Sequence, residues 1–436
     1  MNTKVTFTIV SLLLALLAWL PLSVAAQNDP ATVSTALPPL GTGFEQVQRL
    51  AEQGNAVAQN RLGWMYDFGK GVAKDEKQAF AWYQKAAAQD YAPAQVNLGI
   101  DYEKGIAVPK DLKQALAWYQ KAADQGLADA QYAVGYMHAV GEGVPRDFKL
   151  AFQWFLKSAQ QGNAKAQFGV GGCYVEGHGV TQDKKQAVYW FRKSADQGNA
   201  DAQDYLGVMY ATGQGVAKDE QQALAWYLKS ANQGNAIAQN NLGVVYAKGQ
   251  GVAKDDAQAA VWYRKAAEQG HAAAQNNLGV VYAKGQGVAK DDAQAAVWYR
   301  KAAEHGYAAA QNNLGVVYYH GEGVATDHQQ AAYWYQKAAA QGNAFAQYNL
   351  GAMYVRADGV AQDYKQAAYW LSKGAAQNYV PAMYSLAALA ERGFGMPQDK
   401  QQAITLYQKV VAAPNDSDPD TPRLKQLAQQ RLSQLQ

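Results

Sequence analysis

Residues 56–91 read AVAQNRLGWMYDFGKGVAKDEKQAFAWYQKAAAQDY, and this 36-residue unit recurs without insertion along the chain. A shift of 36 residues places Gly63 in one column with eight further glycines, and Ala387 closes the series: Gly99, Gly135, Gly171, Gly207, Gly243, Gly279, Gly315 and Gly351. Residues 239–268 recur letter for letter as residues 275–304, which indicates tandem duplication. The sequence therefore predicts a repeat array of about ten units rather than a set of independent domains.

The first half of each unit predicts a helix, called helix A below. In the first unit Ala58, Leu62 and Tyr66 lie at spacings of four, which is typical of a helix with one packed face. Gly69 and Gly71 follow, and glycine commonly ends a helix in a left-handed turn. Helix A is therefore expected to end at its own glycine.

The second half predicts helix B, which starts after an aspartate. Asp75 has a counterpart in every unit, and its carboxylate can accept hydrogen bonds from free backbone N–H groups. Gln78 follows three positions later, and a Gln in nine of the ten units completes a capping-box pattern. Trp82 begins a column that recurs in nine units and predicts buried aromatic side chains. A helix pair cannot bury both of its faces alone, so successive units must stack.

Composition excludes several classes of protein. The formal net charge is +3, and Lys and Asp alternate through the repeats, so nucleic acid is not an expected partner. The single cysteine, Cys173, excludes an intrachain disulfide and a Cys-rich zinc site. The six histidines fall in different repeat columns without a His-Glu-x-x-His pattern, so neither a metal site nor a cofactor is expected: His138, His178, His271, His305, His320 and His328.

The two ends of the chain are predicted to lie outside the array. Residues 1–26 have the pattern of a secretory signal peptide cut after Ala26, and the alternative is an uncleaved membrane anchor. Residues 27–42 are expected to form a linker, 43–55 an N-terminal capping helix, 56–413 the ten repeats and 414–436 a C-terminal linker and capping helix. The mature protein is then expected in the periplasm or secreted, without stable membrane insertion.

The repeat pattern resembles a known family. Its consensus is A-x-A-Q-x-x-L-G-x-x-Y, then G-x-G-V-x-x-D, then A-x-x-W-Y-x-K-A-A-x-Q-G, which is similar to the Sel1-like repeats, relatives of tetratricopeptide repeats. The resemblance covers residues 56–413, with local departures at Ala107, His138, Ala357 and Ala387. It implies an all-α, right-handed superhelical solenoid whose A helices line the concave side. It also implies a scaffold that binds a protein or peptide partner.

Candidate binding residues lie two positions before each packed leucine of helix A. On this face the series reads Asn60, Val96, Tyr132, Phe168, Asp204, Asn240, Asn276, Asn312, Tyr348 and Tyr384. The asparagine amides can donate and accept hydrogen bonds to an extended peptide backbone, and the aromatic members can hold its side chains. All members except Val96 are therefore predicted to bind a partner. The other interpretation is that the asparagines reflect duplication and cover a solvated face.

An enzyme is the second hypothesis for function. A cysteine-rich branch of the same family has been linked to penicillin binding and hydrolysis, so this chain could be an envelope protein that binds or hydrolyses peptidoglycan fragments or β-lactams. That branch has a disulfide in each repeat, whereas this chain has one cysteine. The position of Cys173 on helix A predicts core packing rather than a nucleophile, and the chain is expected not to be an enzyme. The sequence does not indicate the partner, the pathway or the oligomeric state.

Overall fold

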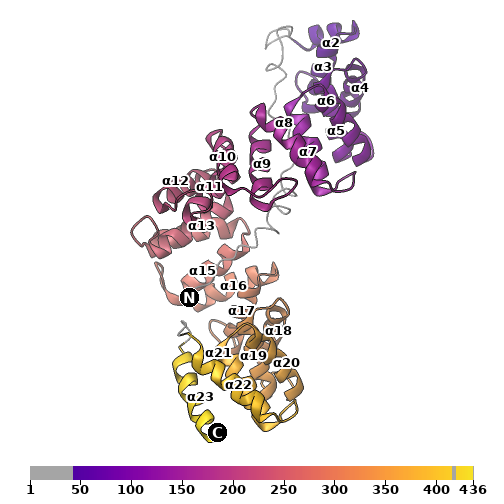
Figure 1. The fold of residues 1–436 in the computed structure, drawn as a ribbon. Coiled ribbons are helices and arrows are strands. Elements are labelled where there is room, and N and C mark those ends of the chain that lie inside the picture. Colours follow the sequence, from indigo (N-terminus) through magenta and orange to yellow (C-terminus); the bar gives the residue numbers. More distant parts are fainter. Residues whose placement is uncertain (1–42, 415–418, 436) are drawn as a thin grey trace. The chain divides into compact units, whose positions relative to one another are not determined.

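The computed structural model describes residues 43–414 and 419–435, so the predicted signal peptide (1–26) and linker (27–42) lie outside the described residues. The chain divides into two compact units, here called the N-terminal unit, described over residues 43–226, and the C-terminal unit, described over 227–414 and 419–435. Across these ranges no residue lies in a strand, and the helices pack in sequential pairs (Figure 1). The predicted all-α repeat solenoid is confirmed.

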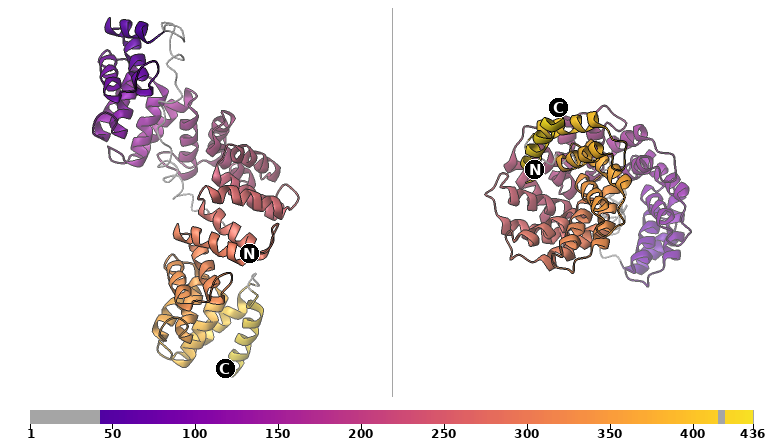
Figure 2. Two further views of the ribbon diagram at one scale, coloured as in Figure 1. Left: turned by 180° about the vertical axis from the view of Figure 1, so that it is seen from behind. Right: turned by 90° about the horizontal axis from the view of Figure 1, so that it is seen from below.

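Each repeat contributes one helix pair. The A helices are α3 (Ala56–Phe68), α5 (Ala92–Lys104), α7 (Ala128–Val140), α9 (Ala164–Glu176), α11 (Ala200–Thr212), α13 (Ala236–Lys248), α15 (Ala272–Lys284), α17 (Ala308–His320), α19 (Ala344–Arg356) and α21 (Val380–Arg392). The B helices are α4 (Glu76–Ala87), α6 (Leu112–Asp124), α8 (Phe148–Gln160), α10 (Lys184–Asp196), α12 (Glu220–Asn232), α14 (Asp256–Glu268), α16 (Asp292–Glu304), α18 (His328–Ala340), α20 (Tyr364–Ala376) and α22 (Lys400–Ala412). The boundary between the two units falls within α12. Figure 2 shows the antiparallel pairs of each unit from two further directions.

The turn between the two helices of a repeat is encoded locally, as predicted. In the sixth repeat α13 ends at Gly249, whose φ of 68° is left-handed, and Ala357 adopts the same conformation in the ninth repeat. The Asp255 carboxylate accepts the N–H of Gln258 at 2.9 Å and caps α14. The backbone N–H of Asp255 donates to the carbonyl of Tyr246 at 2.9 Å, a bond that recurs in all ten repeats.

This last bond corrects the predicted capping box. In a full box the Gln side chain would receive the N–H of the capping residue. The short turn instead brings the end of helix A within reach, and its last carbonyls have no partner inside their own helix. The aspartate therefore caps helix B and also ties it to helix A.

In most repeats the glycine column lies against an aromatic ring, whereas Gly351 of the ninth repeat lies against Leu371. A methyl group at Gly279 would lie 2.6 Å from Cδ1 of Tyr299, so only glycine allows this close approach of α15 to α16. The tryptophan column lies nearer the rim: five of its nine members are buried and four, including Trp298, are half-buried. The Lys301 ammonium lies 4.0 Å from the centroid of the Trp298 ring. The residue after the tryptophan, such as Tyr299, is the deeper aromatic.

A ladder of buried glutamines, which the sequence analysis did not identify, links neighbouring repeats. In the sixth repeat Nε2 of Gln239 donates to the carbonyl of Ala231 at 3.2 Å, on the preceding helix B. Oε1 of Gln239 accepts from Nε2 of Gln269 at 2.7 Å, at the end of its own repeat. In the seventh repeat His305 replaces this second glutamine, and Oε1 of Gln275 is buried without a hydrogen-bond partner.

A helix packs on each end of the described array. In the N-terminal unit α2 (Phe44–Glu52) packs on α3 and buries Val47. In the C-terminal unit α23 (Thr421–Leu435) packs on α22 and α21 and buries Leu432.

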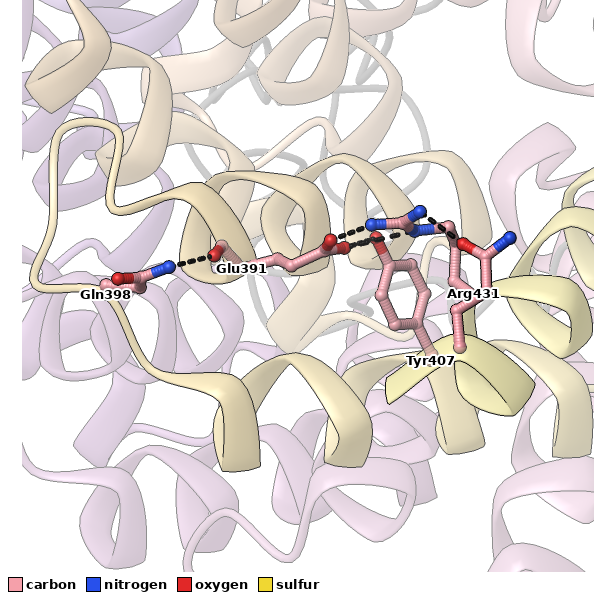
Figure 3. A network of polar contacts seen from close by, with 5 residues as sticks. Glu391, Gln398, Tyr407 and Arg431 are labelled. Atoms are coloured by element: carbon pink, nitrogen blue, oxygen red, sulfur yellow. Dashed lines mark hydrogen bonds and ion pairs between the residues drawn. The ribbon is translucent and has the colours of Figure 1, made fainter. Parts of the chain in front are cut away.

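A polar network fixes α23 on the last repeat (Figure 3). The guanidinium of Arg431 pairs with the carboxylate of Glu391 on α21, which also accepts the hydroxyl of Tyr407 at 3.0 Å. Nε2 of Gln398 donates to the backbone carbonyl of Glu391 at 2.9 Å. Glu391 therefore links the last repeat to α23, and both its carboxylate and its backbone carbonyl accept hydrogen bonds.

Candidate functional site

The predicted asparagines form a ladder, but they bond to one another. Nδ2 of Asn277 donates to Oδ1 of Asn240 at 3.0 Å, and Nδ2 of Asn313 donates to Oδ1 of Asn276 at 2.9 Å. Asn349 reaches Asn312 in the same way at 3.3 Å, and Asn97 reaches Asn60 at 2.9 Å. Asn60, Asn240 and Asn276 are buried and Asn312 is half-buried. The expected solvent-facing position of these amides is therefore wrong, because the next helix A covers them.

Three further predicted residues are also buried in the N-terminal unit. The Tyr132 ring lies 5.7 Å from that of Phe155, and the Phe168 ring lies 5.6 Å from that of Phe191. Both rings pack onto helix B of their own repeat. Asp204 is 4% exposed. These side chains form part of the core between the two helix layers, which corrects their expected exposure on a binding face.

The remaining two predicted residues, Tyr348 and Tyr384, line cavities of the C-terminal unit. A cavity of about 220 Å³ lies between α19 and α21 and includes Tyr348 and Tyr384. A second cavity, of about 210 Å³, lies between α17 and α19 and also includes Tyr348. Tyr348, Ala352 and Arg356 line both cavities. The two cavities therefore adjoin one another across α19, and we call them together the C-terminal groove.

The C-terminal groove is aromatic and positively charged. Its lining includes His320, Arg356 and Arg392, each the last residue of its helix A, and it includes no Asp or Glu. The same last position holds Lys248 and Lys284 in the two preceding repeats of this unit. Basic groups at a helix C-terminus interact favourably with its dipole, which stabilises them there. These basic residues recur every 36 residues, so the basic column could have been identified from the sequence. The many Lys and Asp residues elsewhere in the repeats made it hard to distinguish.

Exposed aromatic side chains extend this groove. Phe345 is 51% exposed, and its ring lies 4.8 Å from that of Tyr379. The Tyr379 ring in turn lies 5.7 Å from that of Tyr348. A solvent-exposed phenylalanine next to a groove is typical of a surface that a partner covers.

A third cavity, in the N-terminal unit, is lined by both acidic and basic side chains. It has a volume of about 400 Å³ and lies between α3, α4 and α5. Its lining includes Asp67, Asp101 and Tyr83. Asp101 is buried, and burial raises the pKa of its carboxyl to about 8, with Asp67 and Glu76 adding to the shift. None of these residues was a predicted binding residue.

Cys173, the single cysteine, lies outside the lining of these three cavities. Cys173 is buried, and burial raises the pKa of its thiol to about 12, so the thiolate is scarce at neutral pH. Within the described residues, no three His, Cys, Asp or Glu side chains are placed to hold a metal ion. Over the same part of the chain, no helix combines the length and the apolar character needed to cross a bilayer.

Comparisons with known proteins agree with this architecture. The family model of the Sel1 repeat matches ten times, at residues 56–91, 92–127, 128–163, 164–199, 200–235, 236–271, 272–307, 308–343, 344–379 and 380–410. A protective antigen of uropathogenic Escherichia coli strains, solved with an SLR fold, is 35% identical with a TM-score of 0.60, over 90% of this chain and 91% of that chain. A Sel1 repeat protein from Oxalobacter formigenes is 32% identical with a TM-score of 0.56, over 73% of this chain and 98% of that chain.

No curated protein matches the chain. Proteins built from these repeats are generally protein-interaction scaffolds and generally not enzymes. Ten consecutive matches span most of the residues that the structure describes. The chain belongs to the Sel1 repeat family.

Proposed function

We propose that this protein is an exported interaction scaffold whose C-terminal groove binds an extended, acidic segment of a partner protein. The observation that carries the proposal is the pair of adjoining cavities that share Tyr348, Ala352 and Arg356. A single pocket would fit a small ligand equally well. Two pockets in line across consecutive A helices fit a chain that passes over several repeats.

The chemistry of the lining defines the partner segment. Tyr348 and Tyr384 offer flat apolar surfaces with hydroxyl groups, which suit aliphatic or aromatic side chains. Arg356 and Arg392 can pair with carboxylates through two parallel N–H donors each. A segment that alternates apolar and acidic side chains therefore complements the groove.

The repeat spacing sets the spacing of the recognised side chains. Packed helices lie about 8 to 10 Å apart, and an extended chain advances about 3.3 Å per residue. Side chains that enter neighbouring pockets should therefore lie about three residues apart. Export to the periplasm or the medium, through the predicted signal peptide at residues 1–26, is part of the same proposal and rests on the sequence pattern alone.

A peptide selection with the full chain tests the proposal. Twelve-residue peptides are selected by phage display, and their affinities are then measured for the wild type, Tyr348→Asn and Arg356→Ala. Asn occupies the position of Tyr348 in several other repeats, for example at Asn312, so this change suits the fold. Both variants should weaken binding at least tenfold, and acidic peptides should dominate the selection.

The matched control is Tyr333→Ala, which removes a tyrosine that is 47% exposed on α18 and does not line the groove. Its affinity should equal that of the wild type. Peptides that bind Tyr348→Asn as tightly as the wild type would remove the groove from the proposal.

A further inference from the structure

We infer that the N-terminal unit contains a second recognition site, a pocket between its first two repeats in which Asp101 receives the ammonium or guanidinium group of an organic cation. This inference concerns a different unit from the C-terminal groove and does not depend on the function proposed there.

Asp101 departs from the repeat pattern in a way that packing does not explain. The equivalent positions in the other nine repeats hold Met65, Met137, Cys173, Met209, Val245, Val281, Val317, Met353 and Leu389. Asp101 is 4% exposed, so a carboxylate here replaces an apolar side chain in a buried position. Burying a charge without a partner is costly.

The carboxylate of Asp101 has no partner within the described part of the chain. No hydrogen bond or ion pair there reaches its oxygens, and the residue lines the cavity of about 400 Å³. Asn97, Tyr83 and the half-buried Asp67 line the same cavity. A carboxyl group of a buried residue that has no protein partner and borders a cavity is the arrangement expected for a group that binds a ligand.

The charges around the pocket favour a cation. Lys74 lies on the lining, but its ammonium already pairs with Glu76 at 2.7 Å, and both side chains are exposed. Lys104 also lines the pocket, and its side chain is exposed. Asp101 is therefore the buried acidic group of the pocket and Asp67 the half-buried one, whereas both lysines are exposed.

The electrostatics of Asp101 agree with this interpretation. Desolvation is the largest cause of its raised pKa; the carboxylates of Asp67 on α3 and Glu76 on α4 raise it further, and Lys104 on α5 lowers it only in part. Without a cation nearby, these surroundings therefore favour the protonated form of the carboxyl up to about pH 8. A cation in the cavity would supply the missing compensation.

The size and walls of the cavity favour an organic cation over a metal ion. A bare ion would fill a small part of about 400 Å³. Although Asp67, Glu76 and Asp101 all line the cavity, no three His, Cys, Asp or Glu side chains of the described residues are placed to hold a metal ion. Ile100, Ile106 and the Tyr83 ring provide apolar walls for an aliphatic stem. The stem and head of a lysine or arginine side chain, or of a small free diamine, share this chemistry.

Calorimetric titration of the full chain tests the inference. The probes are 1,5-diaminopentane, Nα-acetyl-lysinamide and the uncharged Nα-acetyl-norleucinamide. The wild type should bind at least one amine saturably and should not bind the norleucine compound. Asp101→Met should weaken amine binding at least tenfold; methionine occupies this position at Met65 and Met137, so the variant should fold, as a thermal melt would verify.

Asp124→Asn is the matched control, because this carboxylate is exposed on α6, away from the cavity, and its loss should leave binding unchanged. Binding of the diamine alone would assign the pocket to small free amines, and binding of the lysinamide alone would assign it to a partner side chain. The inference is overturned if neither amine binds, if Asp101→Met binds as the wild type does, or if the norleucine compound binds equally well.

Discussion

Replacing His305 by Gln should complete the glutamine ladder and stabilise the protein. In the sixth repeat Gln269 donates to Gln239 at 2.7 Å, whereas in the seventh repeat Oε1 of Gln275 is buried without a partner. The two repeats are otherwise identical over residues 239–268 and 275–304, so the sixth repeat serves as a template for the repaired seventh.

The expected gain follows from two opposing terms. A buried acceptor without a partner costs about 1 to 3 kcal/mol. Ordering a glutamine side chain costs up to about 1.5 to 2 kcal/mol. His305→Gln should therefore raise the free energy of unfolding by about 1 kcal/mol, and Gln269→His should lower it by a similar amount.

Hydrogen exchange of α15 and α16, together with urea unfolding, measures both changes. The local measurement matters because a long repeat array can lose its two-state cooperativity. Gln275→Met provides the control background: methionine stands at the equivalent Met383 of the tenth repeat, and with no acceptor left His305→Gln should have no effect. Equal stability of the wild type and His305→Gln, or a stabilising Gln269→His, would refute the ladder as a source of stability.

Four further predictions concern stability. Because the pKa of Asp101 is raised from 3.8 to about 8, the folded chain keeps a proton that the unfolded chain has lost between these pH values. The free energy of unfolding should therefore fall as pH rises from 5 to 8, by on the order of 1 kcal/mol per pH unit. Urea melts of Asp101→Asn over this range should show no such slope. Nδ1 of His271 accepts the N–H of Ala274 at 3.2 Å, and burial lowers the pKa of this imidazole. The free energy of unfolding should therefore fall as pH drops below about 6.5, where the unfolded chain binds a proton first. His271→Asn should keep the cap and reduce this loss of stability between pH 7 and pH 5 in the same urea melts. Ala357→Gly should raise the free energy of unfolding by about 0.5 to 1 kcal/mol, because φ at Ala357 is 61° and glycine adopts this conformation without strain; a lower melting temperature would contradict this. Asp255→Ala should cost about 1 kcal/mol through the lost cap, and Trp262→Ala about 3 to 5 kcal/mol through a cavity; a larger loss for the aspartate in urea melts would contradict these roles.

The local features of this protein could be predicted from its sequence. The 36-residue period, the helix ends at Gly69 and its counterparts, and the aspartate caps depend on residues a few positions apart. The left-handed conformations at Asp90 and Asn378, both of which replace a glycine at the end of helix B, also agree with expectation. Such features follow from the sequence because backbone sterics and capping act within one turn.

The face of helix A that remains open was decided by the tertiary structure. Of the residues predicted on this side of the helix, Tyr348 and Tyr384 line cavities. The periodicity did not show that the next helix A covers Asn240 and Asn276 and takes up their amide groups. The burial of each position depends on the residue that faces it from the neighbouring repeat, about 36 residues away.

The same dependence explains why the pocket around Asp101 was missed. Asp101 differs from its nine counterparts in the sequence, yet only the stacking of α5 on α3 and α4 shows that its carboxylate borders a cavity shared with Asp67. Local interactions therefore set where each helix of this protein begins and ends, while the packing of one repeat on the next decides which polar groups are paired and which are left for a ligand.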